Sequence, residues 1–123
     1  MTQMPRRIVL TATLLAPLAA MPRPAAAHAV LLSSEPAAGS TVQAGTVTFA
    51  LRFNSRIDRS RSRAELFGAN GERRVMTINP GGSDDTLEVT MIIPPGQNVL
   101  RWQVLAYDGH ITRGEVQFTA VRQ

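Results

Sequence analysis

The sequence contains no cysteine and no lysine, and each absence narrows what the protein can be. Without cysteine the chain forms no disulfides, and metal sites built on thiolates are excluded. Without lysine, all 13 basic side chains are arginines. Aromatic residues make up only 5% of the chain, so it offers few rings for base stacking and nucleic-acid binding is not expected. A chain of 123 residues has room for one domain at most.

The N-terminal part of the sequence has the layout of a secretory signal peptide. Arg6 and Arg7 give a positive start, an apolar run follows, and small alanines lead up to Ala27. The apolar run is shorter than the about 20 residues that a membrane span needs. We therefore expect residues 1–27 to be a signal peptide, cleaved after Ala27, and residues 28–123 to be the exported domain. An uncleaved N-terminal anchor is the alternative, and the arginine pair leaves Sec and twin-arginine export both open.

Cleavage at this point brings the charge of the domain close to neutral. Three of the 13 arginines precede residue 28, which leaves 10 arginines against nine acidic residues. A balance of this kind gives no support to a polyanion as partner. The positive charge of the domain is densest between Arg52 and Arg63. We interpret this stretch as a solvated loop between strands, with a docking patch for an acidic partner as the alternative.

The domain has the hydrophobic pattern of β-strands throughout. Apolar and polar residues alternate over four runs, which predicts strands with one buried face each; these runs are residues 46–53, 86–93, 99–107 and 116–120. Asn70-Gly71 is a typical two-residue hairpin turn. No stretch of the domain keeps a helical period. We therefore predict an all-β sandwich or barrel of about seven strands.

The chain has only two histidines, and both lie at unusual positions. After cleavage His28 is the first residue, so its α-amine and its imidazole can chelate one metal ion. His110 follows Asp108 and Gly109, and the glycine lets the chain turn so that Asp108 and His110 point the same way. Nitrogen donors with one carboxylate oxygen favour Cu(II) over Ni(II) and Zn(II). The spacing in the sequence does not show whether His28 meets the other two residues.

Two separated segments resemble the signatures of the CopC family of periplasmic copper-binding proteins. The domain opens with His28-Ala29, and the stretch from Ser34 to Gly39 has the family's Ser-x-Pro-x-x-Gly pattern. Near the C-terminus, the stretch from Trp102 to Phe118 resembles the family's strand that runs into Asp-Gly-His and is followed by a glycine and a final strand. Between them, residues 49–53 match the family's Leu-x-Phe strand. The resemblance thus covers essentially all of residues 28–123.

This resemblance implies a seven-stranded Greek-key β-barrel or sandwich of cupredoxin-like, immunoglobulin-like shape. It implies that His28, Asp108 and His110 bind one Cu(II) ion, and that the protein serves copper homeostasis and resistance. It also implies an inner-membrane copper transporter of the CopD type as partner, and we expect the domain to be a monomer. Ile111 departs from the family pattern, because proline often stands there.

A Cu(I) site is not expected, because the family's Cu(I) sites use a Met-rich segment with an extra histidine. The domain has two methionines: Met91 on an apolar strand face, and Met76, which we also assign to packing. Trp102 and Tyr107 are assigned to packing as well, although Tyr107, beside Asp108, is also a candidate to line the site.

Two other functions remain open. A copper-dependent oxidase or monooxygenase also uses an N-terminal histidine chelate, but Asp108 as ligand leaves less room for O₂, and we expect no enzymatic activity. The other is an immunoglobulin-like adhesion module without metal.

Overall fold

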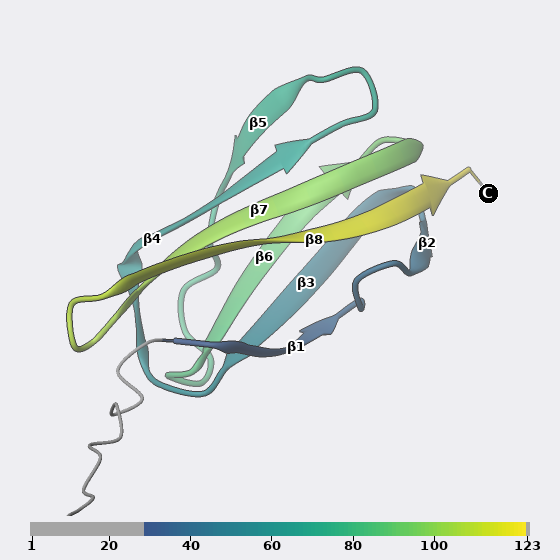
Figure 1. Ribbon diagram of the computed structural model, residues 1–123. Helices are drawn as coiled ribbons and strands as arrows, with labels where there is room; N and C mark the ends of the chain where they lie inside the picture. The colour runs from purple at the N-terminus through teal and green to yellow at the C-terminus, as the bar shows by residue number, and fades with distance from the viewer. Residues whose placement is uncertain (1–28, 123) are drawn as a thin grey trace, which may run out of the picture.

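The computed structural model describes residues 29–122, which form a two-layer β-sandwich (Figure 1). One layer is a three-stranded sheet in the order β1-β3-β6, made of Leu31–Glu35, Gly45–Phe53 and Thr86–Ile93. The other is a five-stranded sheet in the order β2-β8-β7-β4-β5, made of Thr41–Gln43, Ile111–Val121, Gly96–Ala106, Ile57–Phe67 and Arg73–Met76. The described residues contain no helix, and therefore none long and apolar enough to cross a membrane. The all-β prediction is confirmed.

The strand count exceeds the expected seven by one, because β2 is a separate short strand. Its three residues pair in parallel with the end of β8, from Thr41 opposite Thr119 to Gln43 opposite Val121. All other strand pairs are antiparallel. A three-residue strand gives almost no alternation to read in a sequence, which is why this pairing was not predicted.

The core lies between the two sheets and uses the strand faces that the alternation predicts. Apart from Asn98 in β7, the buried residues of β3, β6, β7 and the end of β8 are the apolar members of each alternating run; among them are Phe49, Leu51, Phe53, Leu87, Val89, Met91, Ile93, Leu100, Trp102, Val104, Val116 and Phe118. Two ring contacts join the sheets: the ring centroids of Phe49 and Phe118 are 4.8 Å apart, and those of Phe53 and Trp102 are 5.1 Å apart. Residues 29–122 therefore contain a hydrophobic core that both sheets share.

The arginine-rich stretch is mostly strand, and its interpretation as a loop is wrong beyond residue 56. Strand β4 begins at Ile57, whose side chain is buried, and pairs with β7. The pairing register shifts between Asp58 and Arg63, which marks an irregularity or bulge. A bulge interrupts the alternation that reveals a strand in a sequence, so the charged residues there disguised it.

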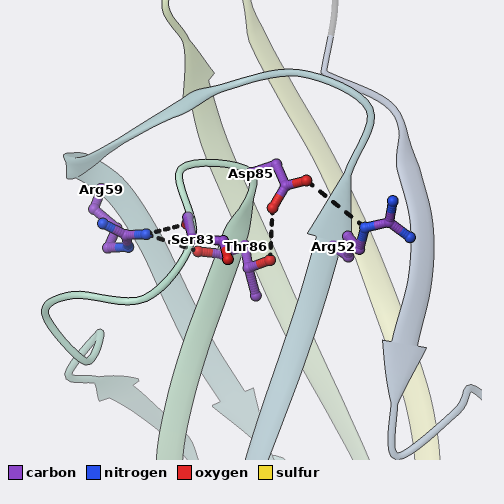
Figure 2. Close-up of polar contacts among 5 residues, drawn as sticks. All are labelled: Arg52, Arg59, Ser83, Asp85 and Thr86. Atoms are coloured by element: carbon purple, nitrogen blue, oxygen red, sulfur yellow. Dashed lines mark hydrogen bonds and ion pairs between the residues drawn. The ribbon is translucent and has the colours of Figure 1, made fainter.

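Several arginines of this stretch hold the loop that leads into β6. Figure 2 shows Arg59 reaching the backbone carbonyls of Ser83 and Thr86, while Arg52 faces the carboxylate of Asp85. The distance from Arg59 Nη2 to the carbonyl oxygen of Thr86 is 3.3 Å, and that from Arg52 Nε to Asp85 Oδ2 is 3.7 Å. These two arginines therefore contact the loop that leads into β6 and the start of that strand.

Candidate metal centre

Asp108 and His110 lie in the tight turn that joins β7 to β8. The Gly109 N–H donates to the carbonyl oxygen of Ala106 at 2.9 Å, and the Ala106 N–H donates to that of His110 at 2.9 Å. Gly109 has a φ of 94°, a backbone conformation that strains any residue with a side chain. The glycine thus lets the chain reverse between the two predicted ligands.

Within this turn the carboxylate of Asp108 contacts His110 twice. Asp108 Oδ1 accepts a hydrogen bond from the His110 backbone N–H at 3.0 Å, and Asp108 Oδ2 lies 3.2 Å from His110 Nδ1. A carboxylate in this position fixes the orientation of an imidazole, as it does beside many metal-ligating histidines. The His110 side chain is 54% exposed and that of Asp108 is 33% exposed. The structure therefore brings together one nitrogen donor and one carboxylate at a surface that an ion can reach.

The segment that directly follows His28 is anchored at the start of the described chain. Ala29 is fully buried in the core. The Val30 N–H donates to Asn54 Oδ1 at 2.8 Å, and the Asn54 N–H donates to the carbonyl oxygen of Val30 at 3.0 Å. Asn54 belongs to the loop between β3 and β4. This loop therefore holds the chain in place two residues after His28.

The same loop contacts the turn that carries Asp108 and His110. The Tyr107 N–H donates to the carbonyl oxygen of Arg56 at 3.3 Å, and the guanidinium carbon of Arg56 lies 4.7 Å from the centre of the Tyr107 ring. Arg56 Nε is also 3.6 Å from Asp84 Oδ2, so its charge is partly balanced. Figure 1 shows the start of β1, the β3–β4 loop and the β7–β8 turn at one end of the sandwich.

Two of the three predicted metal ligands are thus placed in one turn, and the third is outside the described residues. His28 is that third ligand, so its position beside Asp108 and His110 stays a prediction. Within residues 29–122, no group of three or more histidine, aspartate or glutamate side chains is arranged to hold a metal ion. The amine and imidazole of His28 are the further donors that the sequence predicts.

Sequence reasoning missed Asn54 and Arg56, which link the two parts of the candidate site. Asn54 directly follows an alternating strand, and in a sequence an asparagine there indicates only a turn. The assignment of Trp102 to packing is confirmed, since it is 6% exposed. Tyr107 lies outside the core, because its side chain is 64% exposed, and it contacts Arg56 beside the turn.

Comparison with known proteins gives consistent matches over most of the described chain. The family model of the CopC domain matches residues 31–121. Protein YobA of Escherichia coli strain K12 is 29% identical to this chain over 99 residues, which are 76% of this chain and 78% of YobA.

Two solved structures also share the fold. The crystal structure of CopC from Methylosinus trichosporium OB3b is 28% identical, with a TM-score of 0.66, and the match covers 78% of this chain and 96% of that one. That of PcoC, a methionine-rich copper resistance protein from Escherichia coli, is 25% identical, with a TM-score of 0.64, and the match covers 76% of this chain and 99% of that one.

Proposed function

This chain belongs to the CopC family, and we propose that its exported form, beginning at His28, is a periplasmic protein that binds one Cu(II) ion. Family membership and the copper resistance protein among the similar structures support a role in copper handling. The finer proposal concerns the ligands: the amine and imidazole of His28, the carboxylate of Asp108 and the imidazole of His110.

The observation that carries this proposal is the pair of contacts made by the β3–β4 loop. At Asn54 it holds the chain two residues after His28, and at Arg56 it holds the turn one residue before Asp108. A metal ion bound at this end of the sandwich can therefore take donors from both segments. Three nitrogens and one oxygen form the tetragonal donor set that Cu(II) prefers.

The exposure of the turn supports a function in which copper is held and passed on. His110 is about half exposed in a surface turn, so another protein can approach a bound ion without opening the core. We propose that the recipient is an inner-membrane copper transporter of the CopD type, and that the domain acts as a monomer without enzymatic activity. The signal peptide of residues 1–27, cleaved after Ala27, delivers it to the periplasm.

The test compares Cu(II) binding by two chains that differ only at the N-terminus. One chain begins at His28, and the other carries one alanine before it, which moves the free amine away from the imidazole. The chain beginning at His28 is expected to bind one Cu(II) at least about tenfold more tightly, because loss of one chelating donor is worth at least about 1.4 kcal/mol. Equal affinities would overturn the chelate. Incubation of the copper-loaded chain with an organic substrate, ascorbate and O₂ tests the oxidase alternative, and more oxidised substrate than an equal concentration of free copper produces would establish it.

A further inference from the structure

The outer face of the five-stranded sheet carries two arginines that have no acidic partner. Arg63 of β4, Gln103 of β7 and Arg113 of β8 are directly paired in the strand registers, so their side chains form one row on one face. Among the described residues Arg63 makes no side-chain hydrogen bond or ion pair. Arg113 Nε donates to the neutral Gln103 Oε1 at 2.8 Å. Both guanidinium charges in this row are therefore uncompensated.

The carboxylates of the neighbouring row are each occupied by another arginine. Arg101 Nε donates to Glu115 Oε2 at 2.7 Å. Arg73 binds Glu65, and this contact raises the pKa of the Arg73 guanidinium. The two rows surround a hollow of about 440 Å³, lined by Arg63, Glu65, Arg101, Trp102, Gln103, Arg113, Gly114 and Glu115. The hollow is therefore positive in net charge, and guanidinium groups bind carboxylates in a bidentate manner.

Beside this hollow, strand β8 has an open edge. The Ala106 N–H donates to the carbonyl oxygen of His110 at the turn. Counting back from this bond, the residues of β8 whose backbone groups face away from β7 are the alternate ones that begin at Ile111. The backbone bonds of Gln117 to Gly39 and of Thr119 to Ser40 follow this alternation. By the same alternation Ile111, Arg113 and Glu115 direct their N–H and C=O groups outward. β2 pairs only with Thr119–Val121, so in the described part of the chain no strand covers these three residues.

We propose that an extended, acidic segment of a partner protein docks on the β8 edge as an added strand, with a carboxylate on Arg113 and with Arg63 adding to the positive charge of the hollow. Main-chain hydrogen bonds to an open edge supply affinity in this mode of recognition, and side chains on alternate residues supply specificity. A strand presents every second side chain to one face, so the carboxylates of such a segment follow β8 and the one opposite Arg113 can pair with it. Glu65 and Glu115 line the same hollow and disfavour a continuous polyanion such as nucleic acid.

A segment docked on the β8 edge would lie close to the candidate copper ligands. Ile111 directly follows His110, so the end of the docked segment lies next to the candidate metal ligands. A copper acceptor or donor bound in this way is held beside the ion. This consequence rests on the proposed function, whereas the docking itself requires no metal.

The probe is a capped peptide of about eight residues that alternates threonine and glutamate, added to metal-free protein comprising residues 28–123. The first control peptide has lysine in place of glutamate, and the second is the acidic peptide with N-methyl groups on alternate residues. We expect amide NMR shifts of Ile111, Arg113 and Glu115 with the acidic peptide only. Binding of the lysine peptide with equal strength, or shifts confined to other strands, would overturn the proposal.

Substitutions of the arginines test how much their charge contributes to peptide binding, whereas the N-methylated peptide tests the backbone hydrogen bonds to the β8 edge. Arg113→Gln is expected to weaken binding of the acidic peptide about threefold, which is the usual worth of an exposed ion pair, and Arg63→Gln is expected to weaken it less. Arg122→Gln is the matched control, because Arg122 is an exposed arginine past the end of β8, and it is expected to leave binding unchanged. Unchanged binding by the Arg63→Gln, Arg113→Gln double variant, or equal competition by inorganic phosphate or single-stranded DNA, would refute an acidic peptide as the occupant. Since no copper is present, these outcomes do not depend on the metal ligands.

Discussion

Asn54 and Val30 are joined by two hydrogen bonds that run in opposite directions. The side-chain oxygen of Asn54 accepts from the Val30 N–H at 2.8 Å, and the Asn54 N–H donates to the Val30 carbonyl at 3.0 Å. Only the first bond depends on the asparagine side chain. The pair fixes the chain just after His28, although neither residue is a candidate ligand. We therefore regard Asn54 as a positioning residue of the proposed copper site.

Asn54→Ala is expected to weaken Cu(II) binding severalfold in the chain that begins at His28. The substitution removes the acceptor for the Val30 N–H, so the segment next to His28 is less well ordered in the metal-free protein. Cu(II) binding then has to order this segment, and the affinity falls. The loss of stability should be small, about 0.5–1.5 kcal/mol, because the bond is exposed and water can replace it. Isothermal titration with Cu(II) and urea denaturation measure the two effects.

A matched variant and a second background separate positioning from general damage. Asn54→Asp keeps the acceptor oxygen and should retain most of the Cu(II) affinity. In the chain with an additional alanine before His28, Asn54→Ala should no longer change Cu(II) affinity, because the chelate is already lost there. If the effect is the same in both chains, Asn54 acts on the fold and not on the position of His28.

His110→Ala is expected to weaken Cu(II) binding by more than about tenfold, because it removes a nitrogen donor outright. Asp108→Asn keeps the size of the side chain and one oxygen, so it should cost less. It does remove the charge that orients the imidazole across the 3.2 Å contact with Nδ1. Electron paramagnetic resonance of the copper-loaded variants reports the change in nitrogen ligation. A spectrum unaltered by His110→Ala would exclude this histidine from the ligand set.

The fold could be predicted from the sequence because its strands bury one face only. Phe49 and Leu51 in β3, like Val89 and Met91 in β6, are the buried members of alternating pairs, and their alternation is local information. Where the alternation of apolar and polar residues is interrupted, the strands were not predicted from the sequence. The register shift after Asp58 disguised the first half of β4, and β2 is too short to show a period.

The candidate site was less predictable because its parts come from three segments distant in the chain. The pair formed by Asp108 and His110 is visible in the sequence, since it depends on a turn of three consecutive residues. The role of Asn54 depends on a contact across 24 positions of sequence, which no local pattern encodes. The residue types marked His28, Asp108 and His110 as candidate donors, and the resemblance to the CopC family implied that they bind one ion, but neither indicated a contact of Asn54 with the chain next to His28.

Gly114→Ala is expected to destabilise the domain by about 1–3 kcal/mol, as overpacking of a filled core usually does. Gly114 is paired with Trp102 across β7 and β8, and a Cβ atom at Gly114 would lie 2.3 Å from Cζ2 of that indole. The Trp102 ring therefore has to move, although it also packs edge-on against Phe53. The midpoint of urea denaturation measures the loss of stability.

Trp102→Phe should offset part of the loss of stability that Gly114→Ala causes. The indole Nε1 is buried and has no hydrogen-bond partner in the described structure, so phenylalanine forfeits no bond there. It also removes the ring atoms that the methyl group introduced by Gly114→Ala would strike. The double variant should therefore lose less stability than the two single variants together. If the double variant loses as much stability as the two single variants together, Gly114 is required for a reason other than contact with the tryptophan ring.

The last prediction is that this protein retains Cu(II) but releases Cu(I). Cu(I) is selected by thiolate and thioether ligands, whereas imidazole, amine and carboxylate donors suit Cu(II). The described residues contain two methionines and no cysteine. Met91 is 4% exposed inside the core, and Met76 is partly buried against it. The similar structure of PcoC, by contrast, is that of a methionine-rich protein.

Reduction of the copper-loaded protein with ascorbate, in the presence of a Cu(I)-specific chelator, checks this preference. The chelator should take up the copper completely after reduction, and it should take up none from the oxidised protein. Met76→Leu is the informative variant, because leucine preserves the packing of Met76 against the core and removes only the thioether. Copper that is retained by the reduced protein and lost in Met76→Leu would demonstrate a Cu(I) site. Identical complete release from both chains is the result that the burial of these methionines leads us to expect.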